Sequence, residues 1–239
     1  MGILGRTAAV DRDQLLEAAA RARSRGQRRR AISLYREVLA DDRGNTDLHA
    51  KLAPLLAETG QDFDAWNSFR TTAQAALRAG REDRALAIYE QAAKYLPREI
   101  QVWQALARLL ARQGDEGAAV EALLEGSRHF RVPFLLPQAI HLLRRARTVE
   151  PWDFETVIDL AGLLRRCEQR AEARLLLDRL AARVSGRRLR RVRGAQLRLA
   201  PGPRAFWRWL RTREQASQGP EPLRDGLRSE VVPLRAVRR

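Results

Sequence analysis

Small and aromatic residues recur at fixed offsets around a series of turn positions in this sequence. Ala73 lies seven residues before Gly80, and Ala85 lies five residues after it. Tyr89 follows nine residues after the same glycine, and Pro97 follows seventeen after. These offsets fit, in part or in full, at six turn positions, which are residues 26, 60, 80, 114, 134 and 168. Such a periodicity predicts a repeated helical hairpin.

Alanine stands five residues after every turn position. The six alanines are Ala31, Ala65, Ala85, Ala119, Ala139 and Ala173. Another small residue stands seven before each turn: Ala19, Ala53, Ala73, Ala107, Ser127 and Ala161. Where two helices cross closely, larger side chains would hold the backbones apart. We therefore expect both series to be buried, with the turn glycine ending the first helix of each hairpin.

The steps between successive turn positions alternate between long and short. The long steps run from 26 to 60, 80 to 114 and 134 to 168, and the short steps from 60 to 80 and 114 to 134. A long step of about 34 residues accommodates one helix–turn–helix unit, whereas a short step leaves room for a single helix between two turns. Phe69, for example, lies nine residues after Gly60 and eleven before Gly80. One helix therefore serves two neighbouring hairpins, and the larger unit, one long and one short step, has three helices.

The pattern predicts an all-α chain, because no alternating run of Val, Ile or Thr indicates a strand in its body. Ten antiparallel helices are expected at 13–24, 28–40, 46–58, 62–78, 82–95, 99–112, 116–130, 135–148, 153–166 and 170–184. We assign residues 13–185 to this repeat domain and expect residues 1–12 to be flexible. Residues 186–214 are expected to form Arg/Trp-rich capping helices, and residues 215–239 a disordered tail.

Charge is concentrated at the C-terminal end. The chain has 239 residues and a formal net charge of +16, and arginine accounts for all but two of the 45 basic residues. Residues 186–239 hold 15 arginines and 4 acids, a net of +11, so residues 1–185 carry only +5. GC-rich coding explains much of the arginine bias, but a basic tail also attracts nucleic acid, anionic lipid or acidic protein.

The compartment signals favour the cytoplasm. Cys167 is the only cysteine, so the fold does not depend on a disulfide within the chain. The first ten residues lack the apolar stretch of a signal peptide, and no long apolar run predicts a membrane span. We therefore expect a cytoplasmic protein.

The repeat resembles the tetratricopeptide repeat (TPR) over roughly residues 13–184. The likeness is carried by Gly80, Ala85, Tyr89, Ala92 and Pro97, followed by Trp103, Ala107, Gly114 and Ala119. It implies a TPR-like α-solenoid whose first helices line a concave groove that takes a peptide or helix. The short steps depart from a plain tandem array, and the copies at 134 and 168 lack the turn glycine.

A basic groove is the candidate binding site that this resemblance implies. The candidate partner-binding residues are Gln101, Gln104, Arg108, Arg112, Arg165 and Arg166. They suit an acidic segment of a partner, although the alternative is that they are ordinary solvated arginines. The region that would clamp a C-terminal carboxylate in some TPR domains offers Leu16, Ala20, Ala50 and Pro54, so that mode is not supported.

No catalytic, metal or cofactor site is predicted. His49, His129 and His141 lack a second ligand at metal-binding spacing, and Cys167 lacks a nearby histidine. The segment Gly114–Gly117 lacks the lysine and hydroxyl of a phosphate-binding loop. We interpret His49 as partly buried structure and expect a protein that is not an enzyme.

The Arg/Trp-rich extension admits three interpretations: a cap on the repeat array, an interfacial membrane anchor, or a nucleic-acid contact. Its candidate contact residues are Arg204, Trp207, Arg208, Trp209 and Arg211. The sequence thus favours a scaffold or adaptor that binds a protein or peptide along the solenoid. The alternative is an adaptor that uses its extension on nucleic acid or a membrane surface. The sequence leaves the oligomeric state and the partner open.

Overall fold

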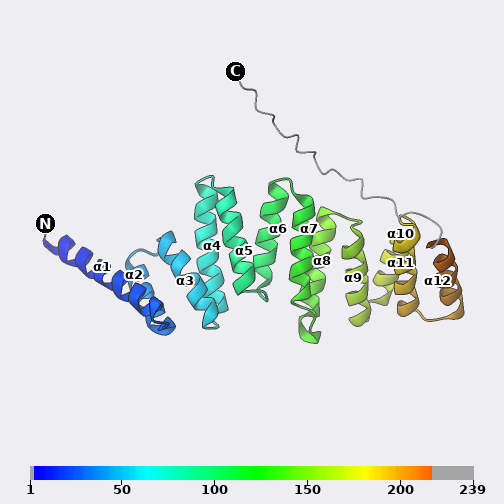
Figure 1. Cartoon of the computed structure of the whole chain (residues 1–239), viewed down its shortest axis with the longest axis horizontal. Coiled ribbons are helices and arrows are strands. Elements are labelled where there is room, and N and C mark those ends of the chain that lie inside the picture. The colour runs from blue at the N-terminus through cyan, green and yellow to red at the C-terminus, as the bar shows by residue number, and fades with distance from the viewer. Residues whose placement is uncertain (1–2, 217–239) are drawn as a thin grey trace, which may run out of the picture. The chain divides into compact units, whose positions relative to one another are not determined.

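The computed structural model describes the backbone of residues 3–216 and the side chains of residues 12–212, and within the former it contains helices and no strand. The helices are α1 (Ile3–Ser24), α2 (Arg28–Asp41), α3 (Thr46–Glu58), α4 (Asp62–Arg78), α5 (Glu82–Tyr95), α6 (Ile100–Arg112), α7 (Glu116–Arg128), η1 (Pro133–Leu135), α8 (Leu136–Val149), α9 (Phe154–Arg166), α10 (Arg170–Ala181), α11 (Gly186–Leu199) and α12 (Pro203–Ala216) (Figure 1). The all-α, TPR-like helical-repeat architecture predicted from the sequence is confirmed.

The helix ends follow local signals at most of the predicted positions. Asn45 caps α3, its side-chain oxygen accepting a hydrogen bond from the Leu48 amide at 3.1 Å. Asp115 and Asp153 cap α7 and α9 in the same way. The first predicted helix is wrong at its start, because α1 begins at Ile3 and not at residue 13. That the N-terminal residues are flexible stays a prediction.

The turns show why glycine recurs. The glycines at positions 26, 60, 80 and 114 have φ between +68° and +85°, a region that residues with a side chain rarely adopt. Glu168 takes the same left-handed conformation, with φ of +59°, so it is a turn residue as the pattern predicts. The turn expected at Phe134 is different. Phe134 lies inside η1, because Pro133 and Pro137 favour a short 3-10 helix between α7 and α8.

The two series of small residues are buried as expected. All six alanines after the turns are 0% exposed, and the residues seven before the turns are between 0% and 5% exposed. The aromatic or leucine nine after each turn is also buried: Tyr35, Phe69, Tyr89, Leu123, Leu143 and Leu177. The positions that repeat in the sequence are therefore buried positions of the helices.

The shared helices are confirmed too. α4 packs against both α3 and α5, and α7 packs against both α6 and α8. Each of these helices therefore completes one hairpin and begins the next. This arrangement accounts for the short steps in the sequence, because a single helix separates two successive turns.

The chain forms two compact units, Met1–Gln169 and Arg170–Arg239. The boundary lies between α9 and α10, inside the segment 13–185 that the sequence assigns to one repeat domain. In the second unit α10 packs on α11 and α11 packs on α12. α12 includes residues 215 and 216 of the predicted tail, and residues 217–239 lie outside the described residues. That α11 and α12 cap the repeat array stays a prediction.

Candidate binding surfaces

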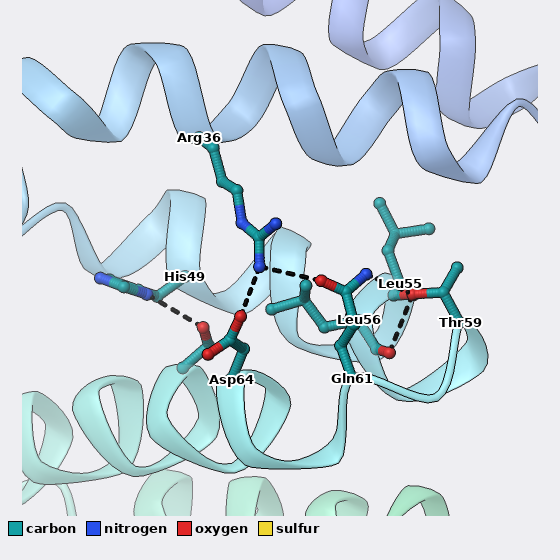
Figure 2. Close-up of polar contacts among 8 residues, drawn as sticks. Arg36, His49, Leu55, Leu56, Thr59, Gln61 and Asp64 are labelled. Carbon is teal, nitrogen blue, oxygen red and sulfur yellow. Dashed lines mark hydrogen bonds and ion pairs between the residues drawn. The ribbon is translucent and has the colours of Figure 1, made fainter.

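A polar cluster ties the first two hairpins together. Figure 2 shows Arg36 of α2 extending to Gln61 and Asp64 at the beginning of α4. The guanidinium donates to the Gln61 amide oxygen at 2.9 Å and forms an ion pair with the Asp64 carboxylate. Gln61 in turn donates to Thr59, whose hydroxyl donates to the carbonyl of Leu55 at the end of α3. Because these groups satisfy one another, the cluster fixes the stacking of hairpins and is not an open site.

His49 of α3 lies between Arg43 and Ser68 of α4. It is half-buried, with its Nε2 3.0 Å from the Arg43 carbonyl and its Nδ1 3.2 Å from the Ser68 hydroxyl. Since a carbonyl can only accept, the Nε2 nitrogen carries a proton, and in neutral His49 the Ser68 hydroxyl donates to Nδ1. The interpretation of His49 as partly buried structure is confirmed.

Four of the candidate groove residues lie on one stripe of α6. At 100° per residue, Gln101, Gln104, Arg108 and Arg112 fall within an arc of about 80°. Gln101, Arg108 and Arg112 are not buried, and Gln104 is half-buried. The opposite side of α6 carries buried Val102, Leu106 and Leu109. The stripe is therefore a solvent-facing surface of the first unit.

Aromatic side chains from α4 and α5 lie beside this stripe. The indole nitrogen of Trp66 donates to the Gln101 amide oxygen at 2.8 Å, and the Trp66 ring lies 6.1 Å from the Tyr89 ring. Trp66 is 3% exposed and Tyr89 5% exposed, so both rings are packed between helices. Gln101 thus satisfies a buried indole, which gives this candidate residue a structural role.

The positive charges of three arginines act electrostatically on the Tyr89 phenol. Burial raises the pKa of Tyr89 above its usual value of 10.0, while the positive charges of Arg108, Arg70 and Arg112 lower it in part. The three arginines come from α4 and α6, and their charges act on one point of α5. We call this set, Arg70, Tyr89, Gln104, Arg108 and Arg112, the α4–α6 surface.

The arginines of the α4–α6 surface differ in their partners. Arg112 pairs with Glu82 of α5 at 2.7 Å, and Arg70 donates to the Asn67 side chain at 3.0 Å. Within the described residues, Arg108 has neither an ion pair nor a side-chain hydrogen bond. The least compensated charge of this surface therefore lies at Arg108, in the middle of the α6 stripe.

Arg165 and Arg166 lie apart from that surface in the described contacts. Both are exposed near the end of α9, and Arg166 donates to the backbone carbonyl of Arg131 at 3.2 Å. Arg131 pairs in turn with Asp159 of α9 at 2.5 Å. No hydrogen bond or ion pair between described residues links these two arginines to the α6 stripe, so the structure does not join the six candidate residues into one site.

The first unit also has a hollow that the sequence did not predict. It has a volume of about 620 Å³ and is lined by Arg23, Gly26, Arg28, Asp47, Ala50, Lys51, Pro54, Leu55, Glu58 and Gln91. Its wall combines the end of α1, one side of α3 and Gln91 of α5. Arg28 and Glu58 already pair across it at 2.5 Å. We considered Ala50 and Pro54 only for a carboxylate clamp, and no repeated pattern joins them to Arg28 or Glu58.

The candidate residues of the extension separate onto two sides of α12. Arg204, Trp207, Arg208 and Arg211 line one shallow hollow, and Trp207 is 58% exposed. Trp209 lies on the other side and is half-buried against α11. Its indole lies close to Gly194, where an added Cβ would be 3.5 Å from Nε1, and Arg190 lies 5.8 Å from the ring centre. Trp209 is therefore a packing residue within the second unit.

Metal-binding clusters and membrane spans are both absent from the described residues. These residues hold no group of three or more His, Cys, Asp or Glu side chains placed to bind a metal ion. None of their helices is both long enough and apolar enough to cross a membrane.

Neither a protein-family model nor a curated protein sequence matches this chain. Among solved structures, a TPR protein from Parabacteroides merdae is 12% identical, with 86% of this chain and 92% of that chain covered and a TM-score of 0.33. A thermophilic TPR protein from Thermus thermophilus is 16% identical, with coverages of 87% and 92% and a TM-score of 0.34. TPR-like repeats of a putative kinesin light chain from Podosopora anserina are 17% identical, with coverages of 80% and 97% and a TM-score of 0.35. The fold assignment stands on the helix order and turns of this chain itself.

Proposed function

We propose that this protein is a non-catalytic scaffold that binds an acidic segment of a partner protein on its α4–α6 surface. The observation that carries the proposal is the exposed Arg108 on the α6 stripe, which has no ion pair or side-chain hydrogen bond among the described residues. Arg70 and Arg112 are the other arginines whose charges act on Tyr89. These three arginines come from two helices, and among the described residues Arg112 is the one of them that has an ion pair, with Glu82. An acidic peptide supplies the missing negative charge.

The neighbouring side chains suit a peptide. Gln104 is half-buried on the same stripe, and its amide can donate to and accept from a peptide backbone. The Trp66–Gln101 hydrogen bond holds the floor of the surface in place. Because the surface is already ordered, binding requires ordering of the peptide and of a few long side chains only.

The test measures binding of a short fluorescein-labelled peptide of alternating glutamate and leucine by the full chain, using fluorescence anisotropy. A lysine–leucine peptide of equal length serves as the ligand control. In the variant Arg70→Glu/Arg108→Glu, two attractions become two repulsions. At about 0.2–1 kcal/mol for each attraction lost and each repulsion gained, the loss is about 0.8–4 kcal/mol, or roughly 4- to 900-fold in Kd.

Arg78→Glu/Arg84→Glu is the matched control. It reverses two exposed arginines of α4 and α5 whose charges are not among those acting on Tyr89. We expect the control variant to bind the acidic peptide with a Kd within about two-fold of wild type, because salt screens the effect of its changed net charge. Equal losses in the two double variants would refute a defined surface, as would equal affinity for the acidic and basic peptides.

A crosslinking experiment addresses the natural partner. A photoreactive amino acid at position 104 of the full chain is expected to capture a protein in cells, and capture should fall when Arg70 and Arg108 are reversed. The same group at position 84 is the control. Capture of the same protein with equal yield from both positions would contradict the proposed surface.

A further inference from the structure

The outer face of α12 combines an exposed indole with three guanidinium groups. Arg204, Trp207, Arg208 and Arg211 fall within an arc of about 100° on the helix and line one hollow. We refer to these four residues as the α12 outer face. Trp207 is 58% exposed, which is costly for a large aromatic ring, and among the described residues its ring contact is with Phe206, at 6.3 Å between ring centres.

The charge on this face is not offset within the described residues. Arg204, Arg208 and Arg211 take part in no ion pair or side-chain hydrogen bond there. α11 and α12 together hold ten arginines and one acid, Glu214, a net of +9. A ligand of this face must therefore be strongly anionic and must also offer a flat group to the indole.

We propose that the α12 outer face binds single-stranded nucleic acid, with Trp207 stacking on a base and the flanking arginines binding phosphates. Arg204 and Arg208 precede and follow Trp207 at i−3 and i+1, and Arg211 lies at i+4. The stretch from Arg204 to Arg211 spans about 10 Å of helix, so its arginines can contact more than one phosphate of a strand. Stacking on an aromatic ring tolerates any base, so the face needs no sequence preference.

The arrangement favours a nucleic acid over a lipid surface. A helix that lies in a membrane interface inserts a wide apolar face. In α12 the side that carries Trp209 is packed on α11, and Thr212 is buried. The exposed aromatic residues are Phe206 and Trp207, and arginines flank Trp207 along the helix. A single strand is favoured over a duplex, because stacking on a duplex base first requires unstacking it.

The test uses the full chain with fluorescein-labelled oligo(dT) and oligo(U) of equal length, in anisotropy titrations over a series of NaCl concentrations. We expect both to bind, since their phosphates and bases offer the same chemistry, and the comparison of the two identifies the preferred strand. Trp207→Ala should weaken binding about 5- to 150-fold, the effect of losing one stacked base. Trp207→Phe should retain most of the affinity, because phenylalanine also stacks.

Two further variants separate phosphate binding from net charge. Log K falls as log salt rises, and in Arg204→Gln/Arg208→Gln this fall should become less steep by about 1.4. That is about 0.7 for each phosphate of a single strand that is no longer neutralised. Arg78→Gln/Arg84→Gln removes the same charge from the first unit and should leave the slope unchanged. Phe134→Ala is the aromatic control, because Phe134 is 76% exposed but lies on η1.

The proposal is overturned if Trp207→Ala binds the oligonucleotides as tightly as wild type does. Nonspecific electrostatic attraction of the oligonucleotides to the basic extension would then explain the binding. The proposal is also overturned if duplex DNA binds as tightly as the single strands with no effect of Trp207. Trp207-dependent binding to phosphatidylserine-containing vesicles without oligonucleotide binding would assign the face to a membrane instead. Arg70→Glu/Arg108→Glu should leave oligonucleotide binding within about two-fold of wild type. The proposal for the α12 outer face can therefore fail while that for the α4–α6 surface holds, and the reverse.

Discussion

Gly126 is the position where one methyl group should disturb the fold most clearly. It lies near the end of α7 against Trp103 of α6, and an added Cβ would lie 2.5 Å from Cγ, 2.7 Å from Cδ2 and 2.9 Å from Cβ of that tryptophan. The ring cannot move away at low cost. Its Nε1 donates to the Pro97 carbonyl at 3.0 Å, and the ring stacks on His129 with 5.5 Å between centres.

Two opposing effects set the size of the change. Alanine is favoured over glycine in a helix by about 1 kcal/mol, whereas overpacking a well-filled site costs about 1–3 kcal/mol. The added methyl group would contact two ring atoms of Trp103 and its Cβ, which lies close to the backbone. We therefore place the overpacking cost near the upper end of its range. Gly126→Ala should therefore destabilise the protein by about 1–2 kcal/mol and lower the Tm by about 2–8 °C.

Gly162→Ala is the matched control, since Gly162 lies in α9 and an added Cβ there meets no described atom within 4 Å. That variant should be up to about 1 kcal/mol more stable than wild type, because only the helix preference remains. Urea unfolding followed by circular dichroism at the helix band measures both, with tryptophan fluorescence as a second probe. Gly126→Ala with an unfolding midpoint equal to or above that of wild type would refute the packing argument.

Two other substitutions test single features. Tyr89→Phe removes a phenol whose pKa burial raises above 10.0. The raised pKa contributes to the free energy of unfolding, and this contribution is full below about pH 10. It is lost as the pH rises through the folded pKa, because the unfolded phenol ionises first. The variant should therefore lose less stability than wild type in alkaline unfolding experiments, and an unchanged slope would contradict this. Gly80→Ala places a side chain at φ of +68° where an added Cβ meets no described atom within 4 Å, and should lower the stability by about 1–2 kcal/mol; an unchanged urea midpoint would refute the strain.

The fold could be predicted because its determinants repeat. The offset of five residues from turn to alanine identifies residues that are all 0% exposed in the structure. The alternation of long and short steps between turns identifies α4 and α7 as shared helices from the sequence alone. Each of these features occurs several times, so a pattern within one sequence is enough to reveal it.

The packing partner of Trp103 is also marked in the sequence, although we did not predict it. Trp103 lies eleven residues before Gly114, and Gly126 lies twelve after it. At the same offsets around Gly80 stand Phe69 and Ala92, so the larger residue is again matched by a small one. This compensation of size indicates the contact that Gly126 makes with the indole.

Features that occur once were not predicted correctly. The sequence has no repeated signal for the part of α1 before residue 13, or for the 3-10 helix that replaces a glycine turn at Phe134. It also placed Trp209 with Trp207 in one contact set, although the two lie on different sides of α12. Their spacing of two residues indicates this separation, because it places them about 200° apart on a helix. The sequence does not indicate which of the two packs on α11, where Gly194 leaves room for the Trp209 indole.

The same contrast explains why the binding surface is harder to predict than the fold. The position seven before each turn is always small and buried, whereas the next position along the chain holds Ala20, Pro54, Gln74, Arg108, Arg128 and Gly162. Five of these six are exposed, and Pro54 is half-buried. Neighbouring positions of one repeat thus follow different constraints, because the first must fit a helix crossing and the second faces solvent or a ligand. Arg108 belongs to the second kind, so its importance rests on Arg70, Arg112 and Tyr89 around it, and only the packing of three helices brings these together.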